Sequence, residues 1–189
     1  TLMYSSALFA EGTKDLHSAS LEKLDHICRK LHLEPTDHVL EIGTGWGGFA
    51  IHAADHYGCR VTTTTISEEQ YEHAVRLVKE RNLEDRVTVL KQDYRDLTGQ
   101  YDKLVSIEMI EAVGHHYLDT YVNTLSERLK PNGLALIQAI TIVEQRYQIA
   151  VTSVDFIKRY IFPGGFIPSI TRKVCGQIPR NKGLIERPL

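Results

Sequence analysis

Short apolar stretches alternate with amphipathic ones along most of this 189-residue chain, and this alternation limits the folds open to it. The apolar stretches lack a polar residue at every second position, which indicates strands covered on both faces. Strands of this kind, each followed by a helix, favour a parallel sheet with helices on both sides. We therefore predict one α/β domain with a mostly parallel sheet flanked by helices. The expected strands are 38–43, 60–66, 86–93, 103–110 and 134–142, and the expected helices are 20–33, 47–58, 67–83, 117–130 and 153–162.

Capping residues predict where several of these elements begin and end. Ser20 is the expected N-cap of the first helix. Ser67 with Gln70 three residues later forms a capping box, and Gly58 is expected to end the helix before it. Residues 131–133, Pro-Asn-Gly, predict a turn.

Composition and charge narrow the classes of function. The chain has no run of 18 or more apolar residues, and its first residues lack the basic and apolar segments of a signal peptide. Its three cysteines have no CxxC spacing, which favours reduced thiols in the cytoplasm. Residues 171–189 hold five Lys or Arg and one Glu, which is a net charge of +4. Because the whole chain has a net charge of −2, residues 1–170 carry about −6. An acidic body argues against nucleic acid as a partner. The basic end is either a solvated terminus or a contact with anionic lipid or a partner.

A glycine-rich loop follows the first expected strand and reads E-I-G-T-G-W-G-G. Glycine lets a ligand lie against the backbone. The first three glycines are spaced G-x-G-x-G, so that the third lies four positions after the first, and the GK[ST] ending of a phosphate-binding loop is absent from the sequence. A carboxylate beside the loop suits a ligand with an ammonium group better than one with a phosphate. S-adenosylmethionine fits this description, and the alternative is a tight turn without a ligand. The residues expected to bind it here are Glu41, Gly43, Thr44, Gly45 and Gly47.

The ends of the second and third strands complete the expected cofactor site, because parallel sheets bind ligands at the carboxyl ends of their strands. The second strand ends in TTTTIS, without the acid that normally holds ribose hydroxyls. The groups that can replace it are the backbone of Thr65 and Ile66 and the side chains of Ser67 and Gln70. For Ser67 and Gln70, the alternative is that they only cap the helix and do not contact a ligand. Asp93 and Tyr94 resemble the pair that brackets the adenine in such folds, although Tyr94 can equally be an ordinary half-buried tyrosine.

Seven stretches together resemble one family. They are MYSSALF (3–9), LEIGTGWGG (40–48), TTISEEQ (64–70), QDYRDL (92–97), VSIEMIEAVG (105–114), LKPNG (129–133) and RYIFPGGFIPS (159–169). The combination closely resembles the cyclopropane-fatty-acyl-phospholipid synthase family, which includes the mycolic acid cyclopropane synthases. The resemblance spans roughly residues 1–170 and implies a Rossmann-like class I methyltransferase that depends on S-adenosylmethionine.

The resemblance also implies a reaction. A methylene group passes from S-adenosylmethionine to a cis double bond of an unsaturated phospholipid acyl chain and forms a cyclopropane ring. In the family a bound bicarbonate ion is thought to be the base. Peripheral contact with the inner face of the membrane and a homodimer are further expectations. The alternatives are another S-adenosylmethionine-dependent C-methyltransferase acting on a lipid or small molecule, and a cofactor-binding fragment without turnover.

Family roles can be carried over to individual residues. Glu111 matches the glutamate that orients the bicarbonate, although a glutamate at a helix N-terminus is the plain alternative. The backbone of Ile107 matches another bicarbonate contact. Tyr4 and Ser5 match the segment that closes over the cofactor.

Two matched positions depart from the family pattern. Ser6 stands where many members carry Cys, and Gln138 stands where many carry His. Both side chains can hydrogen-bond a bicarbonate, but neither supplies the charge of a histidinium. The expected catalytic residues are thus Glu111, Ser6, Gln138 and Ile107. Glu108 is not expected to form an acid–base pair with Glu111.

Three regions carry secondary expectations. Residues 1–170 form the cofactor-binding core, whereas 171–189 do not match the family's last helix and strands. We therefore expect the C-terminal strands to be missing and the basic tail to be divergent and open to disorder. His52 and His56 are four residues apart and are expected to be a surface pair, not a metal site. Residues 153–162 interleave aromatic and basic side chains, which suits a lipid surface, and the segment IFPGGFIP is either an apolar lip or a packed turn.

Overall fold

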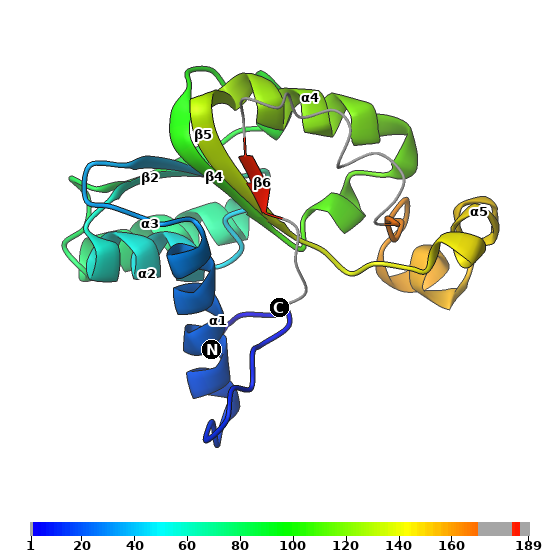
Figure 1. Cartoon of the computed structure of the whole chain (residues 1–189), viewed down its shortest axis with the longest axis horizontal. Helices are drawn as coiled ribbons and strands as arrows, with labels where there is room; N and C mark the ends of the chain where they lie inside the picture. Colours follow the sequence, from blue (N-terminus) through cyan, green and yellow to red (C-terminus); the bar gives the residue numbers. More distant parts are fainter. Residues whose placement is uncertain (1, 170–182, 186–189) are drawn as a thin grey trace.

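A computed structural model describes residues 2–169 and 183–185. Its centre is a six-stranded parallel sheet in the order β3-β2-β1-β4-β5-β6 (Figure 1), which confirms the predicted architecture. The strands are β1 (His38–Ile42), β2 (Arg60–Thr65), β3 (Val87–Lys91), β4 (Tyr101–Ile107), β5 (Leu129–Gln138) and β6 (Gly183–Ile185). The helices are α1 (Leu16–Lys30), α2 (Gly48–Tyr57), α3 (Glu68–Glu80), α4 (Leu118–Arg128) and α5 (Glu144–Thr152). Short turns are η1 (Tyr94–Asp96), η2 (Ile110–Ala112), η3 (His115–Tyr117) and η4 (Ile157–Ile161).

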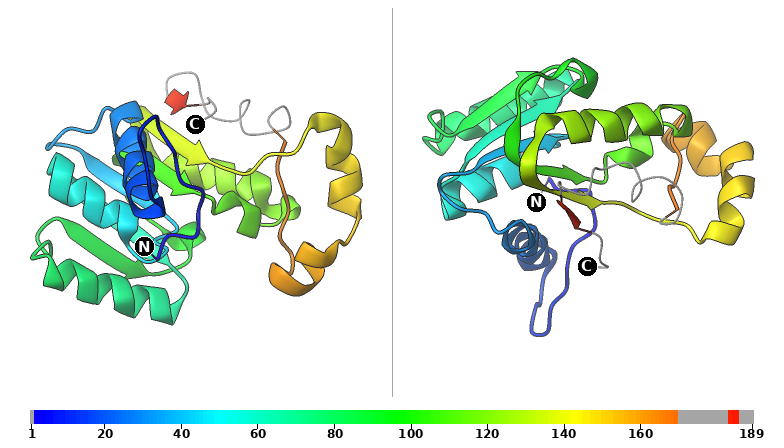
Figure 2. Two further views of the ribbon diagram at one scale, coloured as in Figure 1. Left: turned by 90° about the horizontal axis from the view of Figure 1, so that it is seen from below. Right: turned by 45° about the horizontal axis from the view of Figure 1, so that its top comes forward.

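Helices cover both faces of the sheet, with α1, α2 and α3 on one side and α4 on the other (Figures 1 and 2). Successive strand residues point to opposite faces, so each strand feeds two apolar cores. Val39 and Val105 belong to the core beneath α1 and α2, whereas Leu40 and Leu104 belong to the core beneath α4. This double burial explains why apolar residues occupy successive positions in β1 and β4.

The order of the strands places two loops side by side. The chain runs from β1 outward to β2 and β3, then returns to β4, which pairs with the opposite edge of β1. Ligands of open parallel sheets bind where the order reverses in this way. Here the reversal brings the glycine loop after β1 next to the segment after β4, which contains Glu108 and Glu111.

Two of the predicted caps are confirmed and one is wrong. Ser67 caps α3 by accepting a hydrogen bond from the backbone of Gln70, but the capping box is not completed, because the Ser67 N–H donates to Thr65 Oγ1 and not to Gln70. Gly58 ends α2 in a left-handed conformation. Ser20 does not cap α1. The helix begins at Leu16, because the Asp15 carboxylate accepts from the backbone of Ser18 and starts it one turn earlier.

The Pro-Asn-Gly turn lies inside a strand. β5 begins at Leu129, which pairs with Tyr101, but the next pair joins Lys103 to Leu134. The residues between bulge out of the ladder, and Asn132 has a positive φ of 62°. The turn signal was therefore correct locally, and the strand resumes its pairing beyond it.

The region after β5 differs from the prediction. Helix α5 was not expected, and the predicted helix at 153–162 is reduced to the single π turn η4. Both project away from the sheet (Figures 1 and 2). Where the C-terminal strands were expected to be missing, residues 183–185 pair with β5 as a short parallel strand. The rest of the predicted tail lies outside the described residues.

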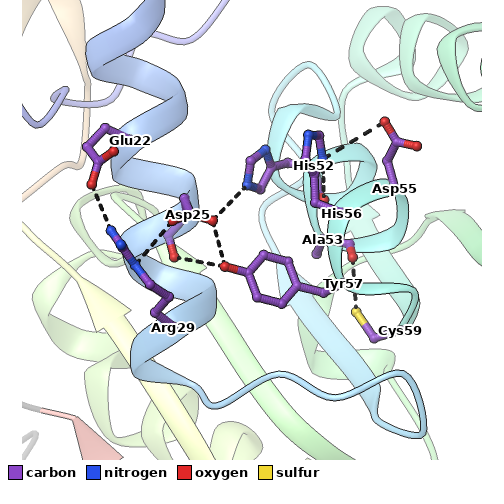
Figure 3. Close-up of polar contacts among 9 residues, drawn as sticks. All are labelled: Glu22, Asp25, Arg29, His52, Ala53, Asp55, His56, Tyr57 and Cys59. Carbon is purple, nitrogen blue, oxygen red and sulfur yellow. Dashed lines mark hydrogen bonds and ion pairs between the residues drawn. The ribbon is translucent and has the colours of Figure 1, made fainter. Parts of the chain in front are cut away.

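A polar cluster joins α1 to α2 (Figure 3). Asp25 on α1 accepts a 2.6 Å hydrogen bond from the Tyr57 hydroxyl and forms an ion pair with Arg29. His52 faces Asp25 at 3.9 Å and stacks on His56 with ring centroids 4.3 Å apart. The expected surface pair is therefore only half right, because His56 is exposed but His52 is buried.

Candidate functional site

The glycine loop after β1 forms one wall of a pocket at the carboxyl end of the sheet. Gly43 and Gly45 both have positive φ values, of 100° and 52°, which a residue with a side chain rarely adopts. Seven of the predicted site residues line this pocket: Tyr4, Ser5, Glu41, Gly43, Thr44, Gly45 and Ile107. The N-terminal segment forms the opposite wall through Leu2 and Met3.

Glu41 lies at the bottom of the pocket and is only 2% exposed. It shares the parity of Val39 and therefore points toward α1. Its carboxylate accepts a 2.6 Å hydrogen bond from Thr63, whose hydroxyl also lies 2.7 Å from that of Thr44. Burial raises the pKa of Glu41 to about 8, against the lowering effects of Thr63 and Lys23.

Lys23 is a pocket residue that was not predicted. It is 1% exposed, and its ammonium donates a 2.6 Å hydrogen bond to the Ser5 hydroxyl. Burial lowers its pKa, and the carboxylates of Glu108 and Glu41 oppose this shift. The signal was present in the sequence, because Lys23 occupies the inward-facing stripe of α1 between Ser20 and Ile27.

The end of β2 closes against the N-terminal segment. The Thr65 hydroxyl donates to the side-chain oxygen Oε1 of Gln70 at 2.8 Å, and the side-chain amide of Gln70 donates to the Tyr4 hydroxyl at 3.4 Å. Tyr4 in turn lies over Gly45. Ser67 acts as the α3 cap, and Ile66 is exposed. Ser67 thus caps α3, and the side chain of Gln70 contacts the site residue Tyr4.

Asp93, Tyr94 and Gly47 have local structural roles. Asp93 begins η1 and forms a 2.7 Å ion pair with Arg95, which keeps the pKa of the carboxyl low. Tyr94 is buried, with its ring edge-on to Tyr121. Gly47 starts α2 in a left-handed conformation, packed against α3. These three residues are absent from the lining of the pocket.

Three of the residues predicted for catalysis lie in the segment after β4 or contact it. Glu111 accepts a 2.6 Å hydrogen bond from the backbone of Ile140, and burial raises the pKa of its carboxyl. Its carbonyl accepts from Phe166, which holds the buried part of the IFPGGFIP segment as a packed turn. Ser6 and Gln138 do not contact Glu111; both donate to Glu108, at 2.9 and 2.8 Å.

Comparison with known proteins assigns the fold to a family. A family model described as mycolic acid cyclopropane synthetase matches residues 1–182. The chain belongs to this family. The cyclopropane-fatty-acyl-phospholipid synthase of Escherichia coli (strain K12) is 41% identical over 169 residues, which are 89% of this chain and 42% of that protein. The tuberculostearic acid methyltransferase UfaA1 of Mycobacterium tuberculosis is 38% identical across 97% of this chain and 44% of its own length.

Solved structures of the cyclopropane synthase family agree with this assignment. The mycolic acid cyclopropane synthase CmaA1, in a complex with SAH and CTAB, superposes with a TM-score of 0.81 at 29% identity. The match covers 89% of this chain and 62% of that one. The predicted resemblance and the Rossmann-like methyltransferase fold are therefore confirmed. The chain spans less than half the length of the two curated relatives described above.

Within the described residues, no helix has both the length and the apolar character needed to cross a membrane.

Proposed function

We propose that this chain is the cofactor-binding core of an enzyme that transfers a methylene group from S-adenosylmethionine to a cis double bond of an unsaturated phospholipid acyl chain, forming a cyclopropane ring. The observation that carries the proposal is the pocket between the glycine loop and the N-terminal segment, which places Glu41 and Lys23 together in a family of methyl-transferring enzymes.

The residues of the pocket fit the amino-acid end of S-adenosylmethionine. A buried carboxylate and a buried ammonium are costly unless each has a partner of opposite charge. Glu41 would hold the ammonium of the methionine end, and Lys23 would hold its carboxylate. The glycines let the ligand approach the backbone, and Tyr4 would cover it. When bound, the cofactor supplies a methyl group made electrophilic by the sulfonium.

The chain's own residues would then shield and orient the reaction. The N-terminal segment is tied down at three points: Tyr4 to Gln70, Ser5 to Lys23 and Ser6 to Glu108. Such a strap excludes water from the reacting carbons, which an alkene substrate requires because it is a poor nucleophile. Glu108 and Glu111 place negative charge where positive charge develops on the acyl chain.

Residues 149–162 supply a surface suited to lipid. The large apolar side chains exposed there are Ile149, Val154, Phe156, Tyr160, Ile161 and Phe162. Arg159 lies over the Tyr160 ring, so a cation accompanies the apolar patch. An exposed apolar patch with basic residues is typical of membrane contact. This supports peripheral binding to the inner face of the membrane, from which an acyl chain would enter the site.

A second candidate is methyl transfer without ring closure. It is favoured by the names of two relatives: the tuberculostearic acid methyltransferase UfaA1, and a probable fatty acid methyltransferase of Pseudomonas putida that is 39% identical over 174 residues. A core that binds the cofactor without turnover is the third candidate.

One experiment separates the three candidates. The chain is incubated with S-adenosylmethionine and vesicles of dioleoyl phosphatidylglycerol, with distearoyl phosphatidylglycerol as the saturated control. Ring closure adds the mass of one methylene to the oleoyl chain and leaves a product that resists mild hydrogenation. A methylene-branched product has the same mass but takes up hydrogen. Binding of the cofactor by calorimetry without a change in lipid mass supports the fragment, and an absence of binding refutes all three.

A further inference from the structure

Ser6 and Gln138, the two side chains expected to hold a bicarbonate, converge on a carboxylate of the protein. Oε1 of Glu108 accepts hydrogen bonds from the Ser6 backbone and hydroxyl, both at 2.9 Å, and from the Gln138 amide at 2.8 Å. The Gln138 amide also donates to the Ser6 hydroxyl at 3.0 Å. Three segments far apart in sequence thus meet at one carboxylate oxygen.

The backbone holds Glu108 in this place. Its φ is +48°, in the left-handed region that residues with side chains rarely adopt. Its N–H donates to the carbonyl of Gln138 at 2.8 Å, so main chain and side chain both bind the end of β5. This arrangement turns the side chain toward Ser6.

Glu108 also lies at the rim of the cofactor pocket. Its neighbour Ile107 lines that pocket, and its other neighbour Met109 packs on Gly43 of the glycine loop. Ser6 follows Ser5, which lines the same pocket. Glu108 is therefore adjacent in sequence to one residue of the pocket wall, Ile107, and its partner Ser6 is adjacent to another, Ser5.

The residues present do not fit a bound bicarbonate. An anion at this point would need the donors of Ser6 and Gln138, which a carboxylate already occupies. It would also lie beside the negative charge of Glu108, with the carboxyl of Glu111 nearby. The cation that acts on Glu108 is Lys23, which is already bonded to Ser5. A carboxylate offers the same planar oxygen acceptors as bicarbonate, so the site carries a built-in equivalent.

We propose that Glu108 replaces the bicarbonate ion and is itself the catalytic base of this chain. The inference rests on the proposed function. Its second oxygen, Oε2, accepts no hydrogen bond from any residue that the structure describes and is free to receive a proton.

The alkene attacks the sulfonium methyl, the electron pair of the C–S bond goes to sulfur, and a carbocation remains on the acyl chain. A C–H bond of the added methyl then breaks. Its electron pair forms the second C–C bond of the ring, and the proton passes to Oε2 of Glu108. The half-buried carboxyl then releases the proton to solvent.

The first test is independent of turnover and follows binding of ¹³C-bicarbonate by NMR. We expect no saturable binding to the wild-type chain. Glu108→Gly removes the carboxylate and frees the donors of Ser6 and Gln138, so it should gain saturable binding. Saturable binding to the wild type would overturn the replacement.

The second test measures lipid product in buffer freed of carbon dioxide. Wild type should be active there, and Glu108→Gln should lose at least about a hundredfold of the rate, as expected for a lost general base. Glu108→Gly should recover as bicarbonate is added. Glu84→Gln, an exposed loop carboxylate, is the matched control and should keep full activity.

Cofactor binding and thermal melting of each variant show that it is folded. Full activity of Glu108→Gln, or a wild type that needs added bicarbonate, would overturn the role of Glu108 and leave the proposed function intact. A wild type that binds cofactor but modifies no lipid under either condition would instead overturn the proposed function, and with it the base, while the bicarbonate measurement still decides which group fills the site.

Discussion

Binding of S-adenosylmethionine should release a proton from Glu41. Burial raises the pKa of this carboxyl to about 8 in the empty pocket, so about nine in ten copies are protonated at pH 7. A ligand ammonium requires the ionised form. Binding at pH 7 should therefore expel about 0.9 proton from Glu41, and the affinity should rise about tenfold between pH 6 and pH 7.

The assay is titration calorimetry at pH 7 in phosphate and in Tris, whose ionisation enthalpies differ. The difference between the two heats gives the number of protons released. Glu41→Gln cannot release this proton, and it should bind about ten- to a hundredfold more weakly at pH 8, as for a lost hydrogen bond to a charged group. Because Lys23 can take up a proton in the opposite direction, the difference between wild type and variant is the quantity to compare. Equal proton release by both proteins would refute the reasoning.

Glu41 should also make the free energy of unfolding depend on pH, and Glu41→Gln should remove this dependence. The raised pKa means that the folded chain holds the Glu41 proton more tightly than the unfolded chain, whose carboxyl titrates near 4.5. The free energy of unfolding should therefore fall as pH rises from about 4.5 to about 8, by up to about 5 kcal/mol at about 1.4 kcal/mol per pKa unit. Glu41→Gln should abolish this fall. A urea midpoint that falls equally in both proteins would contradict it.

Three further predictions concern the surrounding scaffold. Gly47→Ala should destabilise the fold by about 1–3 kcal/mol, because its φ of +86° is costly for any side chain, whereas Gly48→Ala, at an ordinary helical position, should not; thermal melts compare the two. Tyr57→Phe should cost about 1.5 kcal/mol by removing the 2.6 Å hydrogen bond to Asp25, measured by urea denaturation, and an unchanged midpoint would show that the bond contributes nothing. Burial lowers the pKa of His52, so the folded state resists its protonation and stability should fall as pH drops below about 6.5; His52→Gln should flatten this fall in urea midpoints between pH 7.5 and 5.5, and an identical fall would exclude His52 as its source.

The sequence predicts those parts of the fold whose cause is local. Apolar runs predicted β1 and β4, because successive residues of these strands feed cores on opposite faces of the sheet. The Ser67 cap was recognisable because its partner is three residues away. Ser20 was predicted as the α1 cap although Asp15 caps the helix, because both residue types are good caps and no local signal ranks them. Helix α5 was missed because its side chains show no apolar face and none of them is buried.

The chemistry of the site was harder to predict because it depends on long-range contacts. The glycine loop and Glu41 were recognisable as one continuous motif. Glu108 was set aside because its spacing from Glu111 suggested no pairing, and its real partners lie 102 residues before it and 30 residues after it. Lys23 lies within the predicted helix 20–33, whose sequence pattern does not single it out as a site residue. A charged residue on the buried stripe of a helix, or directly after an apolar strand, is the signal that merits more weight.

The N-terminal segment unites the two halves of the proposed reaction. Three consecutive residues bind three different elements: Tyr4 contacts α3, Ser5 contacts Lys23 on α1, and Ser6 contacts Glu108 after β4. The cofactor pocket and the proposed base therefore share one strap, and a ligand that displaces Ser5 from Lys23 also acts on the residue that holds Glu108. We infer that filling the pocket and positioning the base are coupled through this peptide.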